Sequence, residues 1–237
     1  MKAMILAAGE GSRLRPLTLT RPKPMVPMGD RPLLAHTIAW LKRYGITEIG
    51  INLHYKPEVI TEYFGNGADL GVRLVYSYEP EILGTAGGAK ALEGFLDETF
   101  VVVYGDLLTA LDLDAVAAAH RERQAQVTVV LYRVPNPWEC GLVETDATGR
   151  ITRFVEKPPK DQVFTDLANA GVYIMEPGVL ARVPAGRFYD FGHDLFPQLL
   201  AEGVTMIGYP TEQYLLDIGN HEKYNQAQRD LAEGRVV

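Results

Sequence analysis

The chain contains little cysteine, no long apolar run and no recognisable export signal. Its one cysteine, Cys140, has no partner for an intramolecular disulfide, and no Cys and His residues show zinc-site spacing. Charges or prolines interrupt every apolar stretch well before the roughly 20 residues that a membrane-spanning helix needs. The first residues lack the charged and then apolar pattern of a leader. We therefore expect a cytoplasmic protein with no membrane partner.

Basic residues are also in deficit, because 23 Lys and Arg face 30 Asp and Glu and the net charge is −7. Proteins that bind nucleic acid usually carry a basic face, so this balance argues against a nucleic-acid partner. Residues 10–23 depart from it, since they carry four basic side chains against one acidic one. This segment is a candidate docking site for an anionic ligand.

The 237 residues are enough for one large α/β domain. Short apolar runs alternate with helical periodicity over residues 1–134, which predicts a Rossmann-like, doubly wound and mostly parallel sheet with helices on both faces. Residues 135–237 show shorter strands separated by turns, which indicates a smaller mixed α+β half. We expect a single domain made of these two halves.

The expected elements follow from apolar periodicity and from capping residues. Strands are expected at residues 2–7, 49–53, 72–78, 100–104, 127–134, 141–145, 151–156 and 170–175, with a last pair at 206–209 and 214–218. Helices are expected at residues 32–44, 57–64, 85–96, 113–120, 193–202 and 221–232, and a loop is expected between residues 8 and 31.

Chemically suggestive residues follow three of the predicted strands. The Gly9 and Gly11 loop follows the first strand, residues 79–88 follow the third, and Asp106 follows the fourth. Ligands of a doubly wound sheet bind beyond the carboxyl ends of its strands, so the three segments should converge. Glycines let the backbone approach a phosphate, and Arg13 can meet phosphate oxygens with its planar guanidinium.

A glycine loop after a strand also begins the dinucleotide-binding fingerprint. That fingerprint needs a third glycine that leads into a helix, and an acidic residue at the end of the second strand. Here Leu14 takes the third glycine position, Pro16 follows, and the second strand ends in Leu53 and His54. These residues argue against a dinucleotide site.

Seven motifs resemble those of the sugar-1-phosphate nucleotidyltransferases, in the family order and spacing. They are AAGEGSRLRPLT (7–18), PKPMVP (22–27), LGTAGG (83–88), YGD (104–106), FVEKP (154–158), NAGVY (169–173) and LDIG (216–219). The resemblance covers nearly the whole chain.

This resemblance implies a role for each matching residue. The nucleotide would be lined by Leu6, Ala8, Gly9, Gly11 and Ser12, with Arg13 and Lys23 on its phosphates and Glu79, Gly84 and Thr85 flanking base and ribose. Asp106 and Asp217 would share one Mg²⁺, Lys157 would hold the sugar phosphate, and Gly141, Glu156 and Asn169 would contact the sugar hydroxyls.

The implied reaction suits these side chains. A sugar phosphate is already a nucleophile, so the reaction needs alignment and positive charge rather than a protein nucleophile. Mg²⁺ binds through one or two carboxylates plus substrate phosphates, so two aspartates suffice. Pro22 and Pro24 stiffen the backbone around Lys23 and so fix the direction of its ammonium.

Each residue also has a purely structural interpretation when it is taken alone. Asp106 could cap a turn, Lys157 could be a solvated turn residue, and Asp217 could simply end a strand. Glu156 and Asn169 could make local hydrogen bonds, and Glu79 could be only a loop carboxylate.

The sequence departs from the family pattern at three positions. Ser12 stands where Thr is frequent, Leu215 where Trp is frequent, and Asn220 where Thr is frequent. The last two changes reshape the wall near Asp217 and leave the sugar preference open. Because the sequence stops soon after residue 232, we expect no left-handed β-helix and no second, acetyltransferase activity.

The LGTAG and EKP motifs resemble the mannose-1-phosphate guanylyltransferase branch most, which favours GTP and mannose 1-phosphate as substrates. Glucose 1-phosphate with UTP or dTTP is the alternative. A catalytically silent sensor of nucleotide-sugars is a second alternative, because a fold alone does not fix a function. Relatives commonly form dimers or tetramers, so the resemblance is also compatible with a homo-oligomer.

Overall fold

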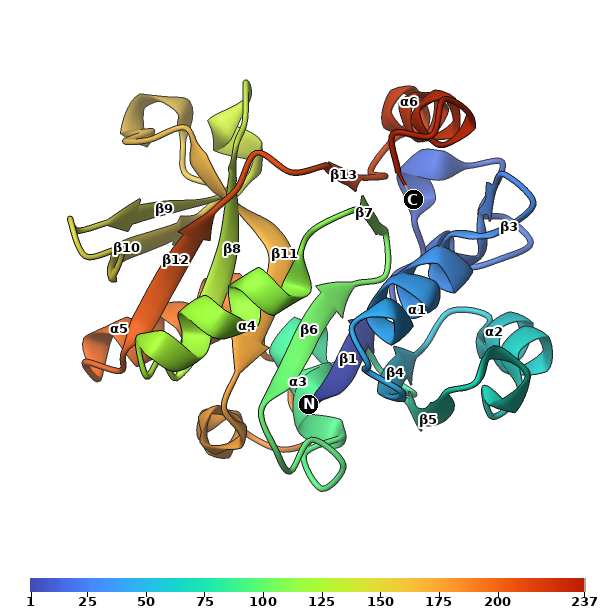
Figure 1. Cartoon of the computed structure of the whole chain (residues 1–237), viewed down its shortest axis with the longest axis horizontal. Helices are drawn as coiled ribbons and strands as arrows, with labels where there is room; N and C mark the ends of the chain where they lie inside the picture. Colours follow the sequence, from blue (N-terminus) through green and yellow to red (C-terminus); the bar gives the residue numbers. More distant parts are fainter. Residues whose placement is uncertain (237) are drawn as a thin grey trace. The chain divides into compact units, whose positions relative to one another are not determined.

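The computed structural model describes residues 1–236, and its contacts divide the chain into two compact units (Figure 1). Unit 1 comprises Met1–Ile82, Val103–Asp112 and the chain from Gln213 onward, and unit 2 comprises Leu83–Val102 and Leu113–Glu212. The units are discontinuous in sequence, so their division differs from the expected one after residue 134. None of the described helices is long and apolar enough to cross a membrane.

Unit 1 is built on a parallel sheet of β1 (Lys2–Leu6), β4 (Glu48–Leu53) and β5 (Arg73–Tyr78). β4 lies in the middle, with Ile51 opposite both Ile5 and Tyr76. β6 (Phe100–Tyr104) enters unit 1 at Val103 and lies next to β1. The buried apolar runs of β1 and β4 explain why the sequence pattern predicted parallel strands.

The helices of unit 1 are α1 (Leu33–Arg43), α2 (Pro57–Phe64) and α6 (His221–Ala232), close to their predicted bounds. The expected loop after β1 contains two short 3-10 turns, η1 (Ser12–Leu14) and η2 (Lys23–Met25), and the small hairpin of β2 (Pro27–Met28) and β3 (Arg31–Pro32). A further 3-10 turn, η3, spans Ala68–Leu70.

A buried cluster in unit 1 joins segments that are distant in sequence. Leu14 from the glycine loop, Leu33 from α1, Leu108, Ile218 and Ala227 from α6 are all at most 2% exposed. Their burial fixes the glycine loop against the C-terminal segment, and this places the two predicted aspartates near the loop.

Unit 2 contains the mixed sheet of β8 (Val127–Arg133), β9 (Gly141–Thr145), β10 (Ile151–Glu156), β11 (Leu167–Met175) and β12 (Met206–Pro210). β11 pairs antiparallel with β8 and β9, β9 pairs antiparallel with β10, and β12 pairs parallel with β8. Its helical segments are α3 (Gly84–Ala91), α4 (Leu113–Glu122), α5 (Phe196–Ala201) and the short turns at 137–139, 160–162, 177–182 and 191–195.

Three predicted elements of unit 2 are wrong in their bounds or type. α3 ends at Ala91 rather than at residue 96, because the amides of Leu92 and Glu93 bond three residues back in a tighter turn. β11 begins three residues earlier than expected, at Leu167. The predicted helix 193–202 begins as a π-helical turn at 191–195, where the Asp190 carboxylate accepts from the first amides.

The predicted last pair of strands does not form. β12 pairs with β8 in unit 2, whereas β13 (Leu215–Asp217) pairs antiparallel with β7 (Leu107–Thr109) in unit 1. β7 was not predicted, because three residues are too few to show a period.

Candidate functional site

The glycine loop of unit 1 folds back onto the stem of Lys23. Gly11 has a φ of 70°, and its carbonyl accepts from the Thr18 hydroxyl at 2.8 Å. A Cβ added at Gly11 would lie 2.7 Å from the Cβ of Lys23, whereas one at Gly9 would meet nothing within 4 Å. Gly11 is therefore required by the fold, and Gly9 is not.

Replacing the two glycines should separate folding from ligand binding. Gly11→Ala should lower the free energy of unfolding by about 1–2 kcal/mol, because the left-handed backbone is costly for alanine and Lys23 must shift. Gly9→Ala should leave unfolding unchanged and should raise the KM for nucleotide if a phosphate approaches that backbone. Urea unfolding and steady-state kinetics measure the two effects. Equal destabilisation by both substitutions would contradict the assignment.

Asp106 and Asp217 are brought together by strand pairing. Gly105 follows β6, its amide donates to the Leu6 carbonyl at 2.9 Å, and a Cβ there would lie 2.8 Å from that oxygen. This close approach puts Asp106 beside the end of β1. Asp217 lies opposite Leu107 in the antiparallel β7 and β13 pair, and the Ile218 amide donates to the Asp106 carbonyl at 2.9 Å.

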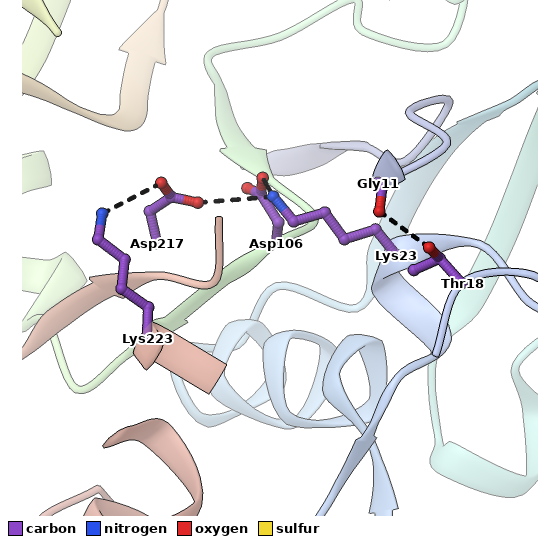
Figure 2. A network of polar contacts seen from close by, with 6 residues as sticks. All are labelled: Gly11, Thr18, Lys23, Asp106, Asp217 and Lys223. Atoms are coloured by element: carbon purple, nitrogen blue, oxygen red, sulfur yellow. Dashed lines mark hydrogen bonds and ion pairs between the residues drawn. The ribbon is translucent and has the colours of Figure 1, made fainter. Parts of the chain in front are cut away.

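Two ammonium groups accompany this acidic pair, which Figure 2 shows from close by. The Lys23 Nζ forms an ion pair with the Asp106 Oδ2 and lies 3.6 Å from the Asp217 Oδ1. The Lys223 Nζ lies 3.5 Å from the other oxygen of Asp217. Lys23 is the buried member, with 11% of its side chain exposed, whereas 42% of the Lys223 side chain is exposed.

The pKa of Asp217 is raised from its ordinary value. Burial is the larger cause and the nearby Asp106 carboxylate is the second, while Lys23 and Lys223 act in the opposite direction. The protein therefore holds two like charges close together, and added positive charge stabilises them.

The acidic pair fits a magnesium ion. No group of three or more potential ligands from His, Cys, Asp and Glu occurs within residues 1–236, but Mg²⁺ commonly uses one or two carboxylates and takes its other ligands from water and phosphate. The Lys23 ammonium lies within ion-pair distance of both carboxylates, so one cation can contact both aspartates at this position. Gly219 leaves space between Asp217 and Arg13, since a Cβ there would lie 3.0 Å from the Asp217 Oδ2 and 3.6 Å from the Arg13 guanidinium.

Glu79 is fully buried. Its Oε1 accepts from the Asn52 Nδ2 at 2.8 Å, and the Asn52 side-chain Oδ1 accepts from the Ala7 backbone amide at 2.8 Å. The contact of Glu79 with base or ribose stays a prediction. Glu79 helps to hold the start of the glycine loop through Asn52, which the sequence did not single out.

Asn52→Ala should destabilise the protein by about 2–4 kcal/mol, because it removes partners from two buried polar groups at once and each such loss costs about 1–3 kcal/mol. Asn66→Ala is the matched control, since Asn66 is exposed and its side chain accepts from the nearby Ala68 amide. Urea unfolding of both variants measures the difference. A loss below 1 kcal/mol in Asn52→Ala would show that the network contributes little.

Two of the predicted sugar-contacting residues, Gly141 and Glu156, lie next to each other in unit 2. A Cβ at Gly141 would lie 2.5 Å from the Glu156 Oε2, and one at Gly192 would lie 2.6 Å from it. A side chain at either position would displace the Glu156 carboxylate from where it lies. Burial raises the pKa of Glu156, and Asp190 adds to the effect, whereas Lys157 opposes it. The Lys157 Nζ lies 3.5 Å from the Glu156 Oε1.

Thr85 is engaged within unit 2. Its hydroxyl donates to the Asp190 Oδ2 and accepts from the Phe191 amide, both at 2.8 Å. A Cβ at Gly84, which has a φ of 75°, would lie 2.6 Å from the Tyr189 carbonyl oxygen. Both residues thus anchor the 189–191 segment, and their contact with a nucleotide stays a prediction.

Asn169 makes local hydrogen bonds, as expected if its role is structural. Its Nδ2 donates to the Tyr173 hydroxyl at 2.7 Å, and its Oδ1 accepts from the Gly171 amide at 2.9 Å. These bonds lie where the register of β11 against β8 shifts. A sugar contact of Asn169 remains a prediction.

The predicted site residues thus fall into two sets. Unit 1 holds Leu6, Ala8, Gly9, Gly11, Ser12, Arg13, Lys23, Glu79, Asp106 and Asp217, and unit 2 holds Gly84, Thr85, Gly141, Glu156, Lys157 and Asn169. Sequence reasoning missed Lys223, Asn52, Asp190 and Gly192. Of these four, only Lys223 could have been found from the sequence. It lies one helical turn after Asn220, which caps α6 by accepting a hydrogen bond from the Lys223 amide.

Comparison with known proteins finds a matching family and several relatives. The profile of the nucleotidyl transferase family matches residues 2–234. A UTP–glucose-1-phosphate uridylyltransferase of Synechocystis is 40% identical over 250 residues, which cover 100% of this chain and 64% of the relative. A mannose-1-phosphate guanylyltransferase of Mycobacterium tuberculosis is 39% identical over 237 residues, with coverage of 98% and 65%. The chain therefore spans just under two thirds of the length of these relatives.

Two solved structures share the fold. One is a Bacillus anthracis protein, provisionally described as a glucose-1-phosphate thymidylyltransferase and solved with sucrose. It has a TM-score of 0.88 at 25% identity, and the match covers 100% of this chain and 96% of the Bacillus chain. HddC of Yersinia pseudotuberculosis, solved with GMP-PN, has a TM-score of 0.82 at 25% identity, with coverage of 97% and 99%. They confirm the predicted α/β fold class with a mostly parallel central sheet.

Proposed function

Because this chain belongs to the nucleotidyl transferase family, whose sugar-1-phosphate branch it matches, we propose that it makes a nucleotide-sugar. An oxygen of the sugar 1-phosphate attacks the α-phosphorus of an NTP, the bond from that phosphorus to the β-phosphate oxygen breaks, and pyrophosphate leaves with the electron pair. The observation that carries the proposal is the acidic pair of Asp106 and Asp217 beside the glycine loop.

The side chains of unit 1 suit the triphosphate. Arg13 is exposed beside Gly219 and presents its guanidinium to an incoming anion, and the glycine loop supplies backbone amides. Asp106 and Asp217 would hold Mg²⁺, which when bound supplies positive charge for the phosphate oxygens. Lys157 of unit 2 is exposed and orients its ammonium for the sugar phosphate, while Glu156 accepts from sugar hydroxyls.

GTP and mannose 1-phosphate are the proposed substrates. The LGTAG and EKP motifs favour them, and a guanylyltransferase is among the relatives. The uridylyltransferase has nearly the same identity, 40% against 39%, so glucose 1-phosphate with UTP or dTTP is the alternative pair.

Release of pyrophosphate tests both the activity and the choice of substrate. Each of four NTPs is combined with mannose 1-phosphate or glucose 1-phosphate, with Mg²⁺ or with EDTA. We expect metal-dependent release that is fastest with GTP and mannose 1-phosphate. If no pair releases pyrophosphate while calorimetry still detects binding of a nucleotide-sugar, the chain is a silent sensor and the catalytic proposal is overturned.

A further inference from the structure

We propose that Lys23 is an internal counter-ion that occupies the acidic pair in the ligand-free protein, and that it must leave before a divalent metal binds there. The inference rests on the proposed function in one respect, namely that Asp106 and Asp217 form the metal site. It adds a coupling between metal and nucleotide that follows from the arrangement of charges.

The position of the Lys23 ammonium carries the first step. It pairs with one oxygen of Asp106 and lies 3.6 Å from an oxygen of Asp217, so it sits where a shared metal would contact both carboxylates. Figure 2 shows it against the Asp106 carboxylate, with a further contact to one oxygen of Asp217. Because only 11% of the side chain is exposed, water screens this interaction less than it screens a surface ion pair.

The local charge balance carries the second step. Two carboxylates face two ammonium groups, so the cluster is neutral before any ligand arrives. A divalent cation that enters this cluster meets the repulsion of Lys23 at close range. The acidic pair is therefore a poor metal site as long as Lys23 stays in place.

The triphosphate supplies the means of release. The stem of Lys23 packs under Gly11 of the glycine loop, so a phosphate on that loop offers the ammonium a second anionic partner. Once Lys23 turns to the phosphate, the carboxylates regain their negative charge toward a metal. Metal and nucleotide consequently bind with positive coupling, and by linkage each strengthens the other.

Lys223 provides a matched comparison. It also contacts Asp217, but through the oxygen turned away from Lys23, and it is 42% exposed. Removing either lysine deletes one positive charge from the cluster. Only removal of Lys23 vacates the point between the two carboxylates.

Binding of Mn²⁺ to the nucleotide-free chain, measured by electron paramagnetic resonance of the free ion, tests the proposal without any turnover. We expect weak binding by the unaltered chain, a Kd at least about tenfold lower in Lys23→Met and Lys23→Gln, and a change below about threefold in Lys223→Met. Asp106→Asn should abolish binding. Circular dichroism establishes that each variant is folded, and using two Lys23 variants guards against a fault particular to one.

The outcomes separate this inference from the proposed function. If both Lys23 variants bind Mn²⁺ no better than the unaltered chain while Asp106→Asn still abolishes binding, the counter-ion role is overturned and the metal site stands. If Lys223→Met tightens binding as much as Lys23→Met, the effect is one of total charge and the inference is again overturned. If Asp106→Asn binds as well as the unaltered chain, the acidic pair is not the metal site, and both proposals lose their basis.

Discussion

Asp106→Asn is expected to lower kcat by on the order of a thousandfold while the fold stays intact. A bound metal contributes several kcal/mol to charge stabilisation, and about 4 kcal/mol corresponds to a thousandfold at about 1.4 kcal/mol per tenfold. Asn keeps the shape of the side chain but gives up the charge that a hard cation needs. Magnesium-dependent pyrophosphate release measures the loss, and a melting curve establishes the fold.

Asp69→Asn is the control for this substitution. Asp69 belongs to the same unit and is exposed in a short turn, so loss of its charge should leave kcat within about twofold, as for most surface changes. Full activity in Asp106→Asn would remove Asp106 from the metal site. A comparable loss in both variants would point to a general effect of net charge.

Lys157→Met should lower kcat/KM for the sugar 1-phosphate by roughly a hundredfold and leave the KM for nucleotide within about twofold. Hydrogen bonds to charged groups contribute about 1.5–3 kcal/mol, and here the ammonium would meet a doubly charged phosphate. The backbone of Lys157 has a φ of 44°, which few residues other than glycine adopt, and its amide donates to the Cys140 carbonyl at 3.1 Å.

Lys160→Met is the matched control for Lys157. Lys160 lies three residues away, is exposed, and its ammonium stands 4.3 Å from the centre of the Trp138 ring. Its loss should leave the sugar kinetics unchanged. Lys157→Arg should retain part of the activity, since it keeps the charge with another geometry. If the KM for nucleotide rises instead, Lys157 contacts the triphosphate rather than the sugar phosphate.

Elements that depend on local pattern were predictable. β1 has an apolar run after Lys2, β4 has regularly spaced isoleucines, and α6 has a cap at Asn220, so sequence alone placed them within a residue. The pairing of β7 with β13 was not predictable. Each strand has three residues, and more than 100 residues of chain separate them. The sequence therefore has neither an alternating apolar pattern nor a connecting turn that would predict the contact.

The residues of the candidate site also include some that the sequence could predict and some that it could not. The motifs singled out Asp106, Asp217 and Lys23 by residue type and spacing, and the structure brings these three side chains together. The burial of Glu79 could not be predicted, since it depends on its bond to Asn52 from a neighbouring strand. The contact of Lys223 with Asp217 likewise depends on the direction in which α6 leaves β13.

Unit 1 takes its last segment from Gln213 onward, after unit 2 has been traversed. During synthesis, Lys23 and Asp106 therefore leave the ribosome long before Asp217 exists to join them. The cluster of Leu14 and Leu33 likewise waits for Ile218 and Ala227. The acidic pair is thus a late product of translation, and a nascent chain cannot bring Asp106 and Asp217 together until nearly the whole of this sequence has emerged.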